Sequence, residues 1–168
     1  MGAYWPHRVA AVLCCVLASA SAVVELYDLS HRQIPYGQAL RWQQKLYDER
    51  RDAARVRLQG KRPAPALRDA LLLVQHEPVL TLGTASTVDN IVTRTEDLDF
   101  DVVRTTRGGE VTYHGPGQLV AYPVLDLQRN HEADLHWYLR TLEQVVIGVM
   151  SEFALEGERI EGLTGVWV

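Results

Sequence analysis

Cysteine and lysine are both scarce in this chain of 168 residues. The two cysteines, Cys14 and Cys15, are adjacent and lie inside one apolar run. They cannot form a disulfide framework for a domain, and they are poor candidates for a catalytic thiolate or a metal site. Lysine occurs only as Lys45 and Lys61. We expect neither a metal site nor a cofactor.

A net positive charge is also lacking, and so is an apolar run long enough to span a bilayer. The formal net charge is −4, which argues against a general nucleic-acid binder. Hydrophobic residues make up 47% of the chain and charged residues 23%, as in ordinary globular proteins. The length suffices for one domain with a single core.

The first 22 residues differ from the remainder. His7 and Arg8 precede an apolar run over residues 9–17 and a small-residue string over 18–22, and no acidic residue occurs before Glu25. This pattern predicts a targeting segment over residues 1–22, followed by a domain over 23–168. Its shape is nearer to a secretory-type signal than to an Arg-rich presequence.

Basic residues are concentrated early in the domain. Nine of the seventeen Lys and Arg residues fall within residues 41–68, where the only acids are Asp48, Glu49 and Asp52. Two interpretations stay open: a solvated helix surface, or a docking surface for an acidic protein partner.

The first half of the domain alternates between β-prone and helical patterns. We expect a strand over 23–29, a loop over 31–35, and a helix that begins at Tyr36 and ends before an exposed linker over 60–65. Two short strands over 71–75 and 79–82 are separated by Pro78, and residues 84–99 form a loop with at most one helical turn. The apolar face of the helix is predicted to contain Tyr36, Leu40, Tyr47, Ala54 and Leu58.

The second half predicts a hairpin, a strand and a helix. Gly108-Gly109 is a turn signal between β-prone runs at 102–106 and 111–113, and an apolar run over 119–127 is suited to a buried strand. After a loop over 128–133, Asp134 is a good N-cap for a helix. The core-facing stripe of that helix is predicted to contain Leu135, Leu139, Leu142, Val145, Val146, Val149 and Phe153.

The chain stops three residues into another β-prone run, at 166–168. Domains usually end after a complete element, so we expect the domain to be incomplete at its C-terminus.

The stretch from 107 to 118 is the most specific part of the sequence. Glycine lets a ligand approach the backbone without a Cβ in the way, and Gly115-Pro116-Gly117 sets a second turn directly after His114. On spacing alone, a structural histidine between two turns is the commoner case. The alternative is a binding wall made of Arg107, Gly108, Gly109, Glu110, Val111, Thr112, Tyr113 and His114.

The run Arg-Gly-Gly-x-Val-Thr-Tyr-His-Gly-Pro-Gly-Gln at 107–118, followed by an apolar strand that ends in Asp-Leu, resembles the signature of the octanoyltransferases. These enzymes are also called lipoyl(octanoyl) transferases or lipoate-protein ligase B. Residues 73–83, which contain His76 before x-Pro, resemble a second motif of the family. The resemblance covers residues 23–168 and implies an α/β fold with a mixed β-sheet and packed helices, like the catalytic core of biotin and lipoate ligases.

The resemblance also implies a function. The family transfers an octanoyl group from octanoyl-acyl carrier protein to a lysine of lipoyl domains, in 2-oxoacid dehydrogenase complexes and the glycine cleavage H protein. The group passes through a thioester on a cysteine whose thiolate is supported by a lysine. In the family both residues follow a Gly-Val-Trp-Val motif, which here is residues 165–168. No catalytic residue is therefore carried over, and the 168-residue chain is expected to be inactive.

Residues 107–114 are implied as a substrate-binding wall, with Tyr36, His76, Gly115 and Gly117 as weaker candidates. One alternative is a non-catalytic module that binds an acyl group or a partner. Another is an ATP-dependent lipoate or biotin ligase, against which His-Gly-Pro-Gly-Gln at 114–118 argues. We expect a monomer in an organelle, the mitochondrion first, with a plastid or a secretory-type signal as alternatives.

Overall fold

The computed structural model describes residues 23–60, 67–87, 90–91, 95–130 and 133–168. These residues divide between two compact units. Unit 1 contains residues 23–25, Glu49–Leu71 and Pro123–Val168, and unit 2 contains Leu26–Asp48 and Leu72–Tyr122. The expected targeting segment and residues 61–65 of the expected linker lie outside the described residues.

One sheet has the strand order β1-β2-β6, formed by β1 (Val24–Ile34), β2 (Asp69–His76) and β6 (Val120–Val124). Its middle strand, β2, is buried along almost its whole length. The loop expected at 31–35 is wrong, because β1 continues to Ile34. Ile34 lies in the core, and its carbonyl accepts the N–H of Glu77 at 3.3 Å, so strand structure persists up to Pro35.

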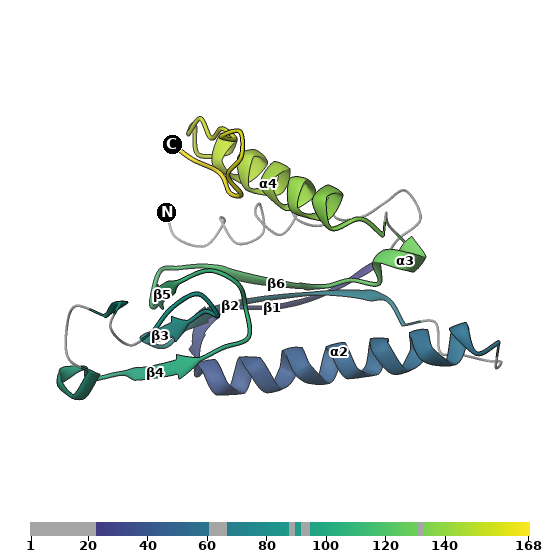
Figure 1. Ribbon diagram of the computed structural model, residues 1–168, viewed down its shortest axis with the longest axis horizontal. Coiled ribbons are helices and arrows are strands. Elements are labelled where there is room, and N and C mark those ends of the chain that lie inside the picture. The colour runs from purple at the N-terminus through teal and green to yellow at the C-terminus, as the bar shows by residue number, and fades with distance from the viewer. Residues whose placement is uncertain (1–22, 61–66, 88–89, 92–94, 131–132) are drawn as a thin grey trace. The chain divides into compact units, whose positions relative to one another are not determined.

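Helix α2 (Tyr36–Leu58) begins where the sequence predicted, and its first turns lie against this sheet (Figure 1). The predicted apolar face holds only in part: Tyr36 and Ala54 are half-buried, but Leu40, Tyr47 and Leu58 are 43%, 52% and 74% exposed. The face that packs is shifted by about one residue, since Ala39 is fully buried and the small side chain lets the helix approach the sheet. The core here consists of Ile34, Ala39, Leu72 and Val74, with Leu29, Trp42, Val120 and Tyr122 packed against it.

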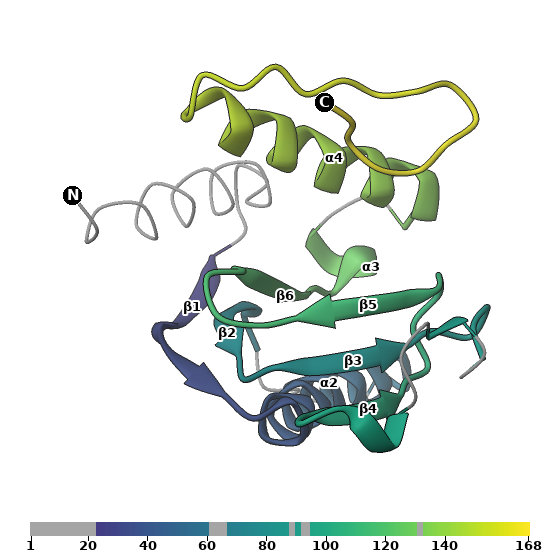
Figure 2. The ribbon, with the colours of Figure 1, turned by 90° about the vertical axis from the view of Figure 1, so that its left-hand side faces the viewer.

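A second sheet has the order β4-β3-β5, formed by β3 (Val79–Leu82), β4 (Asp101–Arg104) and β5 (Val111–His114) (Figure 2). The strands on either side of Pro78 are confirmed, but they enter different sheets. The predicted hairpin of residues 102–106 and 111–113 is wrong, because β3 lies between those strands. It pairs parallel with β4 and antiparallel with β5. The mixed sheet and the α/β class are thereby confirmed, and the one helical turn allowed in the preceding loop is η2 (Thr95–Asp97).

Helices α3 (Leu127–Asn130) and α4 (Leu135–Ser151) lie in unit 1, which also includes the second half of α2 from Glu49. The loop expected from residue 128 is therefore partly helical. Asp134 is the N-cap of α4, as predicted, and its carboxylate accepts the N–H groups of His136 and Trp137. The predicted stripe holds only in part: Val145 is buried, but Leu135, Val146 and Phe153 are exposed.

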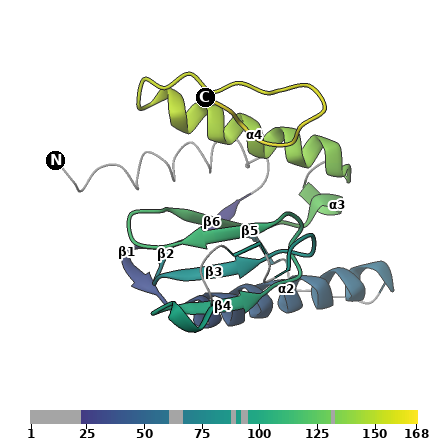
Figure 3. The same cartoon turned by 60° about the vertical axis from the view of Figure 1, so that its left-hand side comes forward.

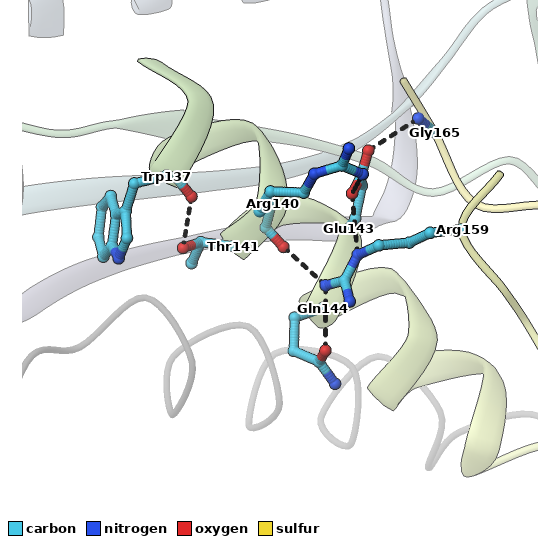
Figure 4. A network of polar contacts seen from close by, with 7 residues as sticks. All are labelled: Trp137, Arg140, Thr141, Glu143, Gln144, Arg159 and Gly165. Carbon is cyan, nitrogen blue, oxygen red and sulfur yellow. Dashed lines mark hydrogen bonds and ion pairs between the residues drawn. The ribbon is translucent and has the colours of Figure 1, made fainter. Parts of the chain in front are cut away.

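The segment that follows α4 runs back along the helix (Figure 3). Glu158 and Trp167 form an antiparallel bridge with two backbone hydrogen bonds of 2.9 Å. The buried carboxylate of Glu143 accepts hydrogen bonds from Arg140 at 2.8 Å, from Arg159 at 2.9 Å and from the N–H of Gly165 at 3.0 Å (Figure 4). The Gly165 N–H, followed by Arg140, holds the pKa of Glu143 below its ordinary value. One side chain of α4 thus fastens the returning segment.

No helix in the described part of the chain is long and apolar enough to cross a membrane. Among the same residues, no group of three or more His, Cys, Asp or Glu side chains is arranged to hold a metal ion.

Candidate functional site

The connection between β4 and β5, residues 105–110, closes over the end of β3 in unit 2. The N–H of Thr105 bonds the carbonyl of Leu82 at 2.9 Å, and the N–H of Thr84 bonds the carbonyl of Arg107 at 2.9 Å. Arg107 fastens the loop from within: its Nη2 donates to the carbonyl and hydroxyl oxygens of Thr81, at 2.9 and 2.8 Å, and to the carbonyl of Glu110 at 2.8 Å. The loop is therefore held in one conformation by hydrogen bonds to β3.

Gly83 allows this loop to lie so close to the chain. A Cβ at Gly83 would overlap the carbonyl of Gly109, whose carbon would be 2.7 Å away. Gly109 itself has φ +82°, in the region that favours glycine. Both predicted wall glycines, Gly108 and Gly109, are exposed. Their N–H groups make no hydrogen bond to an acceptor among the described residues.

Four rings gather beside the loop, and they come from four different elements. His76, at the end of β2, lies 5.3 Å from Tyr36 of α2, 5.7 Å from His114 of β5 and 5.9 Å from Tyr122 of β6, measured between ring centroids. Three residues that the sequence proposed, Tyr36, His76 and His114, are thus brought together. Tyr122 was not among them.

The two histidines differ in how their nitrogens are used. His76 is fully buried; its Nδ1 lies 3.0 Å from the carbonyl of Ile34 and its Nε2 lies 2.7 Å from the hydroxyl of Tyr122. His114 is half-buried, with Nδ1 2.6 Å from Oε1 of Gln118 and Nε2 3.4 Å from the hydroxyl of Thr81. His76 is therefore saturated by protein groups, whereas Nε2 of His114 is only weakly engaged.

Burial sets the protonation of the inner rings. It lowers the pKa of His76, and the nearby His114 lowers it further, against the opposing effect of the Ile34 carbonyl. Burial raises the pKa of Tyr36, an effect that the charge of Arg107 partly offsets. The pKa of Tyr122 is raised well above its usual range, also by burial and then by Tyr36. At neutral pH these three rings are uncharged, and Arg107 is the positive group beside them.

The turn after His114 is anchored to the sheet. The N–H of Gln118 bonds the carbonyl of Gly115 at 3.1 Å across Pro116, and Gly117 has φ +87°, as a type II turn requires. The N–H of Gly117 donates to Oε1 of Gln75 at 2.8 Å, and Nε2 of Gln75 donates to the carbonyl of Ser30 at 2.7 Å. The turn predicted at 115–117 is confirmed, and Gly117 has a backbone role in it.

Other residues of the predicted wall lie apart from the ring cluster. The side chain of Tyr113 is 48% exposed and packs edge-on against Phe100, with ring centroids 5.7 Å apart. Glu110 is exposed, and its contribution is a carbonyl that accepts from Gly83 and Arg107. Gly115 is buried under the Tyr113 ring. Val111 and Thr112 are half-buried in β5, opposite Leu82 and Thr81.

Sequence reasoning missed several residues that build the site: Gln75, Thr81, Gly83, Gln118 and Tyr122. Thr81 could have been found, because a hydroxyl at a buried position of an apolar strand needs a hydrogen-bond partner. Gln118 ends the glycine-rich motif, and its polar side chain beside a turn was a usable signal. Tyr122 stands in an apolar run that predicts only a strand, and nothing local distinguishes Gly83 from an ordinary strand terminus.

Comparisons with known proteins agree on one family. The family model described as the lipoyl protein ligase A/B catalytic domain matches residues 35–168. A chloroplastic octanoyltransferase of Arabidopsis thaliana is 46% identical over 145 residues, which cover 86% of this chain and 49% of that protein. The octanoyltransferase of Nostoc punctiforme is 49% identical over 135 residues, which cover 80% of this chain and 54% of that protein. This chain thus spans about half the length of the curated relatives it matches.

A solved structure supports the fold. A T. acidophilum protein, provisionally described as a lipoate protein ligase, superposes with a TM-score of 0.50 at 17% identity, covering 84% of this chain and 55% of that chain. At this identity the likeness concerns the fold alone. With the family model matched from residue 35 to residue 168, and with relatives identical at nearly half of the aligned positions, this chain belongs to the lipoyl protein ligase A/B catalytic domain family.

Proposed function

We propose that this chain is the acyl-binding part of an octanoyltransferase, which moves an octanoyl group from octanoyl-acyl carrier protein to a lysine of lipoyl domains during protein lipoylation. The observation that carries the proposal is the stretch at 107–118, which lies inside the family match and folds into a fixed loop with open backbone donors. Relatives named octanoyltransferase are 46% and 49% identical to this chain over alignments of 145 and 135 residues.

The loop has the chemistry that a thioester carbonyl requires. Gly108 and Gly109 are exposed residues whose N–H groups have no acceptor among the described residues, and neither has a Cβ to block an approaching acyl group. Fixed backbone donors stabilise the negative charge that develops on a carbonyl oxygen during acyl transfer. The clamp by Arg107 supplies the fixed geometry, because that side chain bonds β3 and the loop together.

Formation of the covalent acyl-enzyme is not proposed for residues 23–168. Residues 23–168 contain no cysteine, and their lysines are Lys45 in α2 and Lys61 after it. The proposal therefore gives acyl binding to this part of the domain, and gives the acyl-carrying cysteine and its lysine to the part of the relatives that this chain does not span. Octanoyl-acyl carrier protein and the lipoyl domains named above are the proposed partners.

Binding of an octanoyl thioester tests the proposal directly. Octanoyl-pantetheine titrated into the ¹⁵N-labelled chain should shift the amide signals of Gly108 and Gly109 in a saturable way, and acetyl-pantetheine should bind at least about tenfold more weakly because it buries less apolar surface. Gly109→Val should abolish the shifts, since it places a branched side chain on a residue with positive φ. Equal binding of both thioesters, or shifts confined to other residues, would remove the support for an octanoyl site.

The alternatives predict different outcomes. A non-catalytic module would bind the thioester in the same way but would gain no transfer activity when the rest of a relative's domain is supplied. An ATP-dependent ligase would bind ATP or an acyl-adenylate, which calorimetry on the purified chain detects.

The compartment follows from the relatives only as a proposal. The plant relative named above is described as chloroplastic. This favours a plastid over the mitochondrion that the sequence suggested first, and the residues that would decide it, 1–22, lie outside the described structure. Imaging of residues 1–22 fused to a fluorescent protein distinguishes the two organelles.

A further inference from the structure

The two ring nitrogens of His114 have unequal partners. Nδ1 lies 2.6 Å from Oε1 of Gln118, a short hydrogen bond, whereas Nε2 lies 3.4 Å from the hydroxyl of Thr81, at the outer limit of one. A neutral imidazole carries its proton on one nitrogen only, so the stronger contact selects the tautomer.

The orientation of the Gln118 amide decides which tautomer this is. Nε2 of Gln118 donates to the carbonyl of Tyr113 at 3.3 Å, and because a carbonyl can only accept, the amide nitrogen must face Tyr113. The amide oxygen is left facing His114. Since an amide oxygen also only accepts, the proton of His114 must lie on Nδ1, and Nε2 carries a lone pair.

Gln118 is itself held in place through its backbone. Its N–H closes the turn onto Gly115, and the adjacent Gly117 is tied through Gln75 to Ser30 of β1. The glutamine thus stands on a turn with two fixed points, and its side chain spans from that turn to His114.

We infer that Gln118 is a positioning residue that holds His114 in the Nδ1-protonated tautomer, so that Nε2 keeps its lone pair and can act as a hydrogen-bond acceptor. His76 has the same tautomer, because its Nδ1 faces the carbonyl of Ile34. Its Nε2, however, accepts the hydroxyl of Tyr122 at 2.7 Å inside the core. Of these two histidines, His114 is the one with a nitrogen to offer.

The fixed tautomer restricts what His114 can recognise. A nitrogen lone pair accepts an N–H or O–H of a ligand, and it cannot donate to a carbonyl oxygen. A lysine amine has N–H groups to donate, whereas a thioester has none. The choice of ligand rests on the proposed function: the lone pair on Nε2 of His114 suits an N–H of the acceptor lysine's amine, and the thioester carbonyl is left to the donors of the glycine loop.

The tautomer can be measured without any ligand, by long-range ¹H–¹⁵N correlation spectra of the imidazole rings. At a pH well above 6.5, the ordinary pKa of histidine, the wild-type chain should show His114 in the Nδ1–H form. Gln118→Ala should shift the tautomer ratio toward Nε2–H by about fivefold to tenfold, as expected for the loss of one hydrogen bond. Gln118→Glu should preserve the Nδ1–H form, because a carboxylate is also only an acceptor.

Two controls separate this outcome from a general disturbance. The His76 signals should stay in the Nδ1–H form in every variant, which reports an intact core. Gln44→Ala, on the exposed side of α2, removes a similar side chain that donates to Asp48 at 3.2 Å, and it should leave both histidines unchanged.

An Nε2–H tautomer for His114 in the wild-type chain would overturn the inference, and so would an unchanged ratio in Gln118→Ala. Neither result depends on ligand binding. If the chain binds no octanoyl thioester but shows the fixed tautomer, the proposed function is wrong and the role of Gln118 stands. If it binds the thioester but His114 is not held in the Nδ1–H form, the role of Gln118 is wrong and the proposed function stands.

Discussion

Among the glycines of the site, Gly83 and Gly108 face very different surroundings. A Cβ on Gly83 would overlap the backbone of Gly109, while a Cβ on Gly108 would have nothing within 4 Å. Gly83 is also buried at the end of β3, whereas Gly108 is exposed. The first glycine is required for close packing, and the second leaves space that a ligand can use.

This contrast gives a prediction for two alanine variants. Gly83→Ala should destabilise the chain by about 1–3 kcal/mol through overpacking, and should move the amide signals of the 105–110 loop. Gly108→Ala should change the stability by less than about 0.5 kcal/mol, as exposed sites usually do. Urea denaturation with amide spectra of the folded forms measures both effects. Equal stability of the two variants would contradict the packing account.

At this scale, the sequence predicted which residues are unusual but not what each one does. Arg107, Gly109 and His114 were found because glycines and a lone histidine stand out in a β-prone stretch. The role of Arg107 as a clamp depends on Thr81, a residue 26 positions away, so local spacing could not reveal it. Gly83 had no local signal because its constraint comes from the Gly109 backbone.

The elements were predicted better than their pairing. The starts of α2 and α4, the strands around Pro78 and the turn at 115–117 each have a local cause, such as an N-cap or a proline. The predicted hairpin at 102–113 was wrong. A glycine pair between two β-prone runs indicates a turn, but it does not show whether the two strands pair with each other or each with β3. Which strand fills the space between them is decided by the sheet.

The basic residues of α2 fall into two groups: those that are buried or paired with a distant acid of the chain, and those that are exposed. Arg50 is buried, and Arg57 forms an ion pair with Asp126 at 2.7 Å. Arg41, Lys45, Arg51 and Arg55 are exposed, so an acidic partner could reach them. Docking of acyl carrier protein on these residues stays a prediction. If it is right, the affinity for acyl carrier protein should fall as the salt concentration rises.

At the level of α4, Glu143 makes the returning C-terminal segment sensitive to acid. Its pKa is below the ordinary value of 4.5, so its stabilising effect is fully present above that pH and is lost as the pH falls through the folded-state pKa. Glu143→Gln should remove the charge that Arg140 and Arg159 face, and the Gly165 amide should exchange about tenfold faster at neutral pH.

Hydrogen exchange of Gly165 as a function of pH measures this effect. In the wild-type chain, protection should fall only below about pH 4.5, and the variant should show no such transition. Glu161→Gln, an exposed glutamate in the same segment, is the matched control and should behave as wild type. An acid transition that persists in Glu143→Gln would assign the titration to another group.

For the whole molecule, the chain is expected to bind an acyl group without carrying it covalently. After incubation with octanoyl-acyl carrier protein, peptide mapping by mass spectrometry should find no octanoyl thioester within residues 23–168, because they contain no cysteine. A double variant, Cys14→Ser with Cys15→Ser, excludes acylation of the two N-terminal thiols. An octanoyl adduct that survives in the double variant would contradict the proposed division of labour.

The family was found from short motifs, the stretch at 107–118 above all and the one at 73–83 beside it, and no property of the molecule as a whole would have supplied it. Composition and charge describe an ordinary globular domain, and the alternation of strands and helices predicts only the α/β class. The gathering of Tyr36, His76, His114 and Tyr122 depends on four elements that are distant in the chain, so it became visible only once the fold had brought them together.

The strand order β4-β3-β5 has a consequence for the synthesis of the protein. β3 is complete at Leu82, yet both of its neighbours are translated later, and the second ends only at His114. At a translation rate of about 5–20 residues per second, β3 has no partner strand on either edge for seconds after its synthesis. During that time other chains can pair with these edges. The glycine-rich stretch that forms the candidate site is also the segment that closes this sheet. Substitutions there should therefore lower the amount of folded protein in the cell, even where they leave the chemistry of the surviving molecules intact.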